Sequence, residues 1–220
     1  MDTYTSMVLI FIIMILAAVA SMQFYRGRKR NIALMEKSIK VITKITDPKE
    51  KNFTWLGGYV GYRAYFKVQK DNIEEFDFTV TLVPRQSAFY YPVAKMTTRH
   101  DRIYIVIYPY TKIRREAHLI QEGYYHLAPR IENEPILRKD EVYVERKNER
   151  IKFKALFERR EDLDKLRKLV SSLSNPRDVK HVSLTPSTNV VYVFMKLNVD
   201  TLEEDVNRIV KFVNEEIVEN

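Results

Sequence analysis

An uncharged apolar run near the start of the chain constrains the fold more than any other feature. Residues 7–24 contain no charged side chain. As a helix with a rise of 1.5 Å per residue, this run covers about 27 Å, which is enough to cross the hydrocarbon core of a membrane. Tyr4 and Tyr25 flank the run at the positions where interfacial aromatic residues sit. The run therefore predicts a membrane-spanning helix.

The basic residues around this run predict its orientation. Only Asp2 is charged before the run, whereas four basic residues follow it at once: Arg26, Arg28, Lys29 and Arg30. Basic residues stay on the cytoplasmic side, so we expect the N-terminus outside and the C-terminal domain in the cytoplasm. A cleaved signal peptide is the alternative, because Ala18-Val19-Ala20 is typical of a cleavage site. A secretory signal has its basic residues before the apolar run, so the observed order favours an uncleaved anchor.

Net charge is concentrated beside the predicted span. The chain carries a net charge of +8, and residues 26–45 hold seven basic residues against one acidic residue, or +6. Such a cluster predicts contact with anionic lipid headgroups, and ribosomal or other RNA is the alternative polyanion. The sequence contains no cysteine, which excludes disulfides, thiol catalysis and cysteine-ligated zinc.

Hydrophobic periodicity predicts an α+β fold, with an N-terminal transmembrane helix followed by a mixed, largely antiparallel sheet and packed helices. Three parts are expected: an extracytoplasmic tip and transmembrane helix (1–25), a basic juxtamembrane helix that continues it (26–50) and a cytoplasmic domain (51–220). The predicted strands are residues 59–68, 76–83, 102–108, 117–121, 141–145, 151–157, 179–184 and 190–197. We also expect helices at 86–97, from Glu161 and from an N-cap at Asp200, and a long loop at 128–140.

No motif for catalysis or cofactor binding is apparent. The glycine cluster at residues 57–61 leads into a predicted strand instead of opening a helix, so it does not form a phosphate-binding loop. The four histidines lack the spacing of a helical metal site, although His118 and His126 could face each other across strands. We predict a protein without enzymatic activity, metal or cofactor. A membrane-bound enzyme would require His118, His126 and carboxylates to converge.

Two features predict binding instead. The apolar segment 88–93, with Met96, lies among basic residues and could contact lipid, a transmembrane partner or RNA. Its alternative interpretation is core packing of a kinked helix. Within the span, Ala17 and Ser21 form a small-xxx-small pair, which would allow close approach of another transmembrane helix, such as that of a small membrane-protein partner.

The order of these elements resembles the calumin-like family, the coiled-coil-containing membrane proteins of the multipass translocon, which form part of a chaperone complex beside the Sec channel. The similarity extends over residues 7–219. It rests on the apolar span with its basic helix, Asn52-Phe53-Thr54, residues 58–68, 76–96, 102–107 and 151–175, HVSL at 181–184, VYVFMKLNV at 191–199 and the closing helix. The sequence lacks the family's acidic segment before the span and its basic coiled-coil tail, as a tail-less archaeal or prokaryotic relative would.

This resemblance implies a non-catalytic accessory factor of membrane-protein insertion, located by the Sec translocon and facing the ribosome. A membrane-tethered scaffold or anionic-lipid-binding module unrelated to translation is the alternative. In either case the expected contacts are basic residues. They are Arg26, Arg28, Lys29, Arg30, Lys37 and Lys40, followed by Arg63, Arg85, Lys95, Arg99, Arg114 and Arg115.

Overall fold

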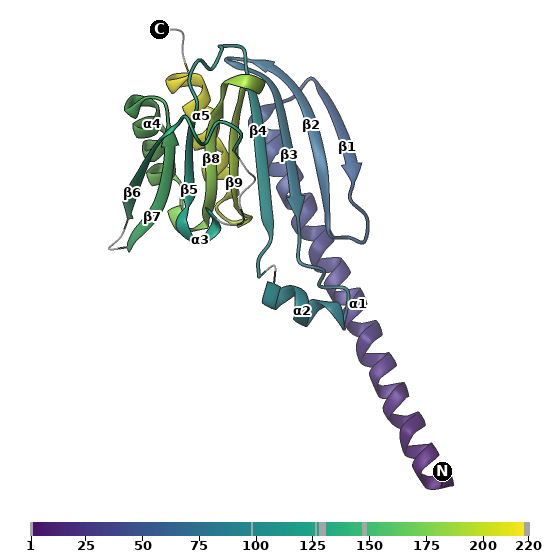
Figure 1. The fold of residues 1–220 in the computed structure, drawn as a ribbon. Coiled ribbons are helices and arrows are strands. Elements are labelled where there is room, and N and C mark those ends of the chain that lie inside the picture. The colour runs from purple at the N-terminus through teal and green to yellow at the C-terminus, as the bar shows by residue number, and fades with distance from the viewer. Residues whose placement is uncertain (1, 98, 126, 128–130, 147–148, 218–220) are drawn as a thin grey trace.

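The computed structural model describes residues 2–97, 99–125, 127, 131–146 and 149–217. It consists of a long first helix, α1 (Thr3–Thr46), and an α+β domain into which the second half of that helix is packed (Figure 1). The helix runs without a break from the apolar run into the basic segment, as predicted. It ends at Thr46, four residues before the bound expected for the juxtamembrane helix, and Asp47 adopts a left-handed conformation (φ 43°) before Pro48.

The domain is built on one nine-stranded sheet in which every strand pair is antiparallel among the described residues, in the order β1-β2-β3-β4-β9-β8-β5-β7-β6. The strands are β1 (Glu50–Trp55), β2 (Gly61–Lys70), β3 (Ile73–Thr81), β4 (Arg102–Pro109), β5 (Ala117–Gln121), β6 (Arg138–Arg146), β7 (Glu149–Phe157), β8 (Val179–Thr185) and β9 (Val190–Lys196).

Three helices cover one face of this sheet: the second half of α1, α4 (Arg160–Ser172) and α5 (Leu202–Glu216). The shorter helices are α2 (Tyr90–Thr97), α3 (Glu122–Tyr125), η1 (Pro176–Asp178) and η2 (Pro186–Thr188). The apolar half of α1 projects away from the sheet, and we call the end of the domain from which it emerges the proximal end. Figure 1 shows α2 at this end, beside α1.

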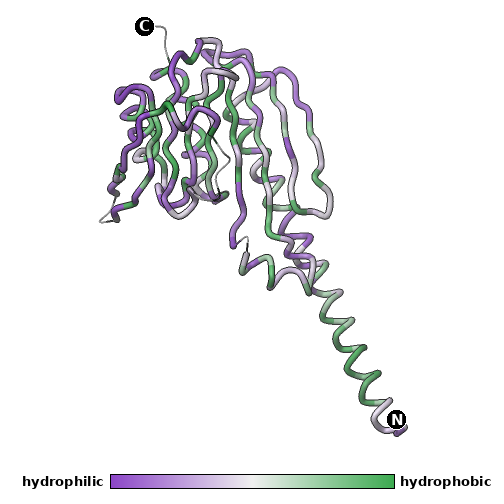
Figure 2. The backbone as a smooth tube through the Cα atoms, viewed as in Figure 1, coloured by the Kyte–Doolittle hydropathy of each residue, from purple (hydrophilic) through white to green (hydrophobic). Residues whose placement is uncertain are grey.

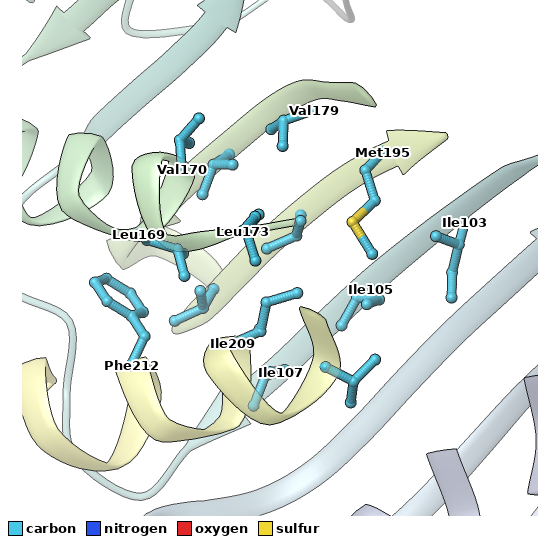
Figure 3. Packing of buried hydrophobic residues seen from close by; sticks show 14 of the residues in the cluster. Ile103, Ile105, Ile107, Leu169, Val170, Leu173, Val179, Met195, Ile209 and Phe212 are labelled. Carbon is cyan, nitrogen blue, oxygen red and sulfur yellow. The ribbon is translucent and has the colours of Figure 1, made fainter. Parts of the chain in front are cut away.

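The main core lies between the sheet and its three covering helices. Ile103, Ile105 and Ile107 of β4 are fully buried and alternate with half-exposed residues, which is the pattern of a strand covered on one face. Figure 3 shows Ile105 and Ile107 near Ile209 of α5 and Leu169 of α4, with Ile103 further along β4. On the opposite face, a small second cluster around Ile120 and Leu156 is covered by the segment after β5.

The predicted fold class is confirmed, but several details differ from the prediction. β1 was not predicted, because all six of its residues are exposed and it lacks a buried face. The expected loop at 128–140 includes the start of β6 at Arg138, and its residues 128–130 lie outside the described residues. The predicted N-cap of α5 is also displaced, because Thr201 occupies that position and the Asp200 carboxylate pairs instead with Lys37 at 2.6 Å.

Candidate functional site: the proximal end of the domain

The first half of α1 is long and apolar enough to cross a membrane. Its apolar stretch makes no buried contact within the protein, and Figure 2 shows it as a mostly hydrophobic rod outside the domain. Ala17 and Ser21, the predicted helix-packing pair, lie on this exposed stretch. The surface of the stretch is therefore available to lipid or to another helix.

The domain is attached to α1 from the end of this stretch onward. Gln23 Nε2 donates a hydrogen bond to the backbone carbonyl of Arg85 at 2.8 Å. One turn later, Gly27 faces the same backbone so closely that an added Cβ would collide with the carbonyl group of Arg85. A further turn on, the buried Asn31 donates through Nδ2 to the carbonyls of Tyr59 (2.9 Å) and Val83 (3.0 Å). These contacts fix the segment after β3 to the helix.

An ion pair holds this segment from its other side. The Arg85 guanidinium donates from Nη1 and Nη2 to the two Asp101 carboxylate oxygens, at 2.8 and 2.7 Å. Nη1 also donates to Asn31 Oδ1 at 3.0 Å, and Asp101 Oδ1 accepts the backbone N–H of Val83 at 2.9 Å. Both side chains of the pair are largely buried, so Arg85, one of the predicted binding residues, has a structural role in linking α1 to the sheet.

Most of the predicted basic residues of α1 form an exposed stripe. The buried positions of the helix recur every three or four residues, so one face is packed on the domain. The opposite face presents Arg26, Lys29, Arg30, Lys37 and Lys40 to solvent. Arg28 is partly buried, with its guanidinium 4.4 Å from the centre of the Tyr59 ring. Arg26, Lys29, Arg30 and Lys40 make no ion pair with any described residue.

The remaining predicted basic residues fall into three groups. Arg63 donates from Nε to both carboxylate oxygens of Asp77, at 3.1 and 3.0 Å, and Arg115 donates to Asp162 at 2.6 Å, so each is held in an ion pair within the domain. Arg114 lies beside Arg115, on the wall of a cavity next to α4 and α5. Lys95 and Arg99, by contrast, are exposed on and just after α2, at the proximal end.

The segment 88–93 proves to be a surface feature. Phe89 is 82% exposed and Met96 is 77% exposed, whereas Ala94 on the other side of α2 is buried. The interpretation as a kinked core helix was therefore wrong. Pro92 falls in the first turn of α2, where a missing N–H breaks no intrahelical bond.

A cavity of about 650 Å³ opens next to α2. Met96, Tyr124 and Phe194 supply apolar walls, and the cationic side chains around it are Arg99, Arg102 and Lys180. The pKa of His100 on its wall is lowered, first by burial and then by the positive charges of Lys180, Arg102 and Lys196. The proximal end thus combines exposed apolar groups with positive charge.

Neither the family models nor the curated proteins that were compared match this chain.

One buried polar network lies away from the proximal end. His118 Nε2 is 2.8 Å from Glu116 Oε1, and His118 Nδ1 is 3.2 Å from His181 Nε2. Asn133 donates to the other Glu116 oxygen at 2.7 Å. If both rings carry their proton on Nε2, each contact has one donor and one acceptor, and only His181 Nδ1 is left unbonded.

This network partly meets the condition set for an enzyme, because His118 does meet a carboxylate. The second predicted histidine, His126, lies outside the described residues. Burial lowers the pKa of His118, and burial together with the neighbouring His118 ring lowers that of His181 to about 3, so both rings are neutral at pH 7. Each of the two residues is 5% exposed, so both rings are largely shielded from solvent. The arrangement is that of a buried structural network.

Proposed function

We propose that this protein is a single-pass, membrane-anchored accessory factor of membrane-protein insertion, with its N-terminus outside and its α+β domain in the cytoplasm. In this role it binds the ribosome or the Sec translocon without catalysing a reaction. The observation that carries the proposal is the unbroken α1, which joins the candidate span to the core of the domain. The resemblance to the calumin-like family supplies the specific partners.

The continuity of α1 determines how the domain meets its partners. A helix of 44 residues is about 66 Å long, roughly twice the thickness of the hydrocarbon core. Its second half is buried in the domain through Met35 and Ile42, and Gly27 and Asn31 hold the segment after β3. No flexible linker separates anchor and domain, so the domain keeps one height above the bilayer and one orientation relative to α1. This geometry suits a subunit that positions other components.

The exposed stripe on α1 extends beyond the reach of lipid headgroups. Arg26, Lys29 and Arg30 lie within about 9 Å of the end of the apolar run at Phe24, a distance comparable to the headgroup layer. Lys40 lies about 24 Å beyond Phe24, which is several Debye lengths at physiological salt. A polyanion that contacts Lys40 as well as Arg26 must therefore extend away from the membrane, as ribosomal RNA would.

Charge reversal along the stripe tests this proposal. Detergent-solubilised full-length protein should co-sediment with ribosomes at low salt and dissociate steeply as salt rises. Lys40→Glu should weaken co-sedimentation, as should the triple reversal of Arg26, Lys29 and Arg30. Reversal of Lys51, an exposed residue on the edge strand β1, serves as the charge-matched control. Wild-type protein that never sediments with ribosomes and never co-purifies with Sec subunits would refute the proposal.

A second candidate function is a membrane-tethered scaffold or anionic-lipid-binding module. The observation that favours it is the concentration of cations next to the span, since each near-surface cation contributes about 1 kcal/mol of attraction to an anionic leaflet. In this case the triple reversal should reduce the anionic lipid that co-purifies in mild detergent. Lys40→Glu should leave that lipid unchanged, and neither variant should affect ribosomes.

A partner helix in the membrane is a further part of the proposal. Ala17 and Ser21 lie four residues apart on an exposed surface of α1, where small side chains permit close helix packing. Replacing both by leucine should reduce co-purification of a small membrane protein. The same exchange at Ala18 and Met22, one residue further along the helix, is the control.

A further inference from the structure

Three bulky apolar residues at α2 share one exposed face. Phe89 immediately precedes α2, and Val93 and Met96 follow it at i+4 and i+7, a spacing that corresponds to positions within about 60° of one another around a helix. All three side chains are more than half exposed. The helix is well formed, since Ser87 accepts hydrogen bonds from Tyr90 N through its hydroxyl (3.3 Å) and from Tyr91 N through its carbonyl (2.8 Å). An ordered helix thus presents a bulky apolar face to its surroundings.

The segment that precedes α2 is fixed to α1 at the point where the apolar run of α1 ends. The Arg85 carbonyl accepts from Gln23, the penultimate residue of that run, and the Arg85 backbone packs against Gly27 one turn later. Between these contacts and Phe89 there are only three residues. Figure 1 shows α2 below the sheet and alongside α1, on the side where the N-terminal half of α1 projects. Its height is therefore set by α1 itself.

The charges of α2 also match a bilayer surface. Lys95 lies away from the apolar face, and Arg99 follows shortly after the helix. Both side chains are exposed, and nearby Arg26, Lys29 and Arg30 add further positive charge. An apolar face flanked by cations is the arrangement of helices that lie in a membrane interface. Acidic residues are absent from the whole segment 85–100.

From these observations we propose that α2 is an interfacial membrane helix. It lies in the headgroup region of the bilayer that α1 crosses, with Phe89, Val93 and Met96 directed toward the acyl chains. This inference rests on the membrane anchoring in the proposed function, and it adds a second point of attachment. A bilayer is favoured over a protein partner because it is continuous with the surface around α1 and is present whenever α1 is inserted.

Two attachment points would define the orientation of the domain completely. A single transmembrane helix can rotate about its own axis and tilt toward any side. A second contact beside it fixes which side of the helix faces the bilayer surface and so restricts both motions. The sheet, including its edge strand β1, would then keep one angle to the bilayer normal. Any partner bound by the domain would then be held in one orientation relative to the membrane.

The single tryptophan of the chain, Trp55, makes a depth measurement possible. In a Trp55→Phe background, one tryptophan is introduced at a time: Ile12→Trp in the span, Phe89→Trp just before α2 and Tyr110→Trp just after the far end of β4. All three positions are exposed, so the substitutions do not disturb the core. The full-length variants are reconstituted into vesicles of phosphatidylcholine and phosphatidylglycerol that contain lipids brominated at known depths.

The proposal predicts strong quenching of Ile12→Trp by deep bromines and of Phe89→Trp by bromines near the headgroups. Phe89→Trp should be quenched several-fold more than Tyr110→Trp, which should resemble a tryptophan in water. If Ile12→Trp is quenched while Phe89→Trp behaves like Tyr110→Trp, the interfacial position of α2 is refuted and the anchor stands. If Ile12→Trp also escapes quenching, the anchor in the proposed function fails, and the inference about α2 fails with it.

Discussion

The backbone of Arg85 lies against Gly27 of α1, and no side chain larger than hydrogen fits between them. This contact joins two segments that are 58 residues apart in the sequence, and it places the segment before α2 next to the end of the apolar run. It also explains a glycine in the interior of a helix, where glycine costs about 1 kcal/mol relative to alanine.

Gly27→Ala should therefore destabilise the protein, although alanine favours helix. We expect the free energy of unfolding to fall by about 1–3 kcal/mol, the usual cost of overpacking, because the Arg85 backbone has to move. Denaturant unfolding in detergent micelles measures the loss. Ala33→Leu on the exposed face of the same helix should change stability by less than about 0.5 kcal/mol. Equal effects of the two substitutions would contradict the tight contact.

Removing Arg85 should be costly, since its partner Asp101 would remain buried and charged. Arg85→Met is expected to lower the free energy of unfolding by about 3–5 kcal/mol. Lys67→Met, which breaks the exposed pair with Glu50, should cost less than about 1 kcal/mol. If Arg85→Met instead preserves stability and impairs only binding, Arg85 is a contact residue after all, as the sequence suggested.

Acid should destabilise the domain through its buried histidines. The pKa of His181 is lowered from 6.5 to about 3, so the unfolded state binds more protons than the folded state between these values. Stability is complete above about pH 6.5 and falls as pH decreases, by up to about 1.4 kcal/mol per pH unit for this group. His118, whose pKa is also lowered, acts in the same direction.

The variant His181→Gln isolates this effect, because a glutamine amide can still donate to His118 Nδ1. Unfolding in denaturant is followed between pH 5 and 7, above the range in which ordinary carboxylates titrate. The slope of the free energy of unfolding against pH should become shallower, by an amount that corresponds to the uptake of up to one proton on unfolding. An unchanged slope would show that His181 does not stay neutral in the folded protein.

Much of the fold was predictable because its signals are local. The alternation in β4 and the apolar stripe of α5 depend on residues a few positions apart, and both elements lie where the sequence placed them. β1 escaped detection since an edge strand needs no buried face. The cap at Asp200 was misplaced because its carboxylate is engaged by Lys37, which is 163 residues away.

The proximal end was harder to predict, since it is created by contacts across long sequence separations. In the sequence, Arg85, Lys95 and Arg99 are all basic residues beside the apolar segment 88–93. Only the fold shows that Arg85 is buried against Asp101, whereas Lys95 and Arg99 are exposed. Gly27 and Asn31 were not singled out either, although a glycine and an asparagine in a basic helix were a detectable signal. Both are weak helix formers, and each proves to face the domain.

The central claim is that α1 crosses the membrane with the domain on the cytoplasmic side, and the absence of cysteine allows a direct test. Single cysteines are introduced at Ser6, before the apolar run, and at Lys40, on the exposed stripe. A membrane-impermeant maleimide should label Ser6→Cys in intact cells and should label Lys40→Cys only after the membrane is permeabilised. Labelling of Lys40→Cys in intact cells, or a mature protein that lacks residue 6, would contradict the account.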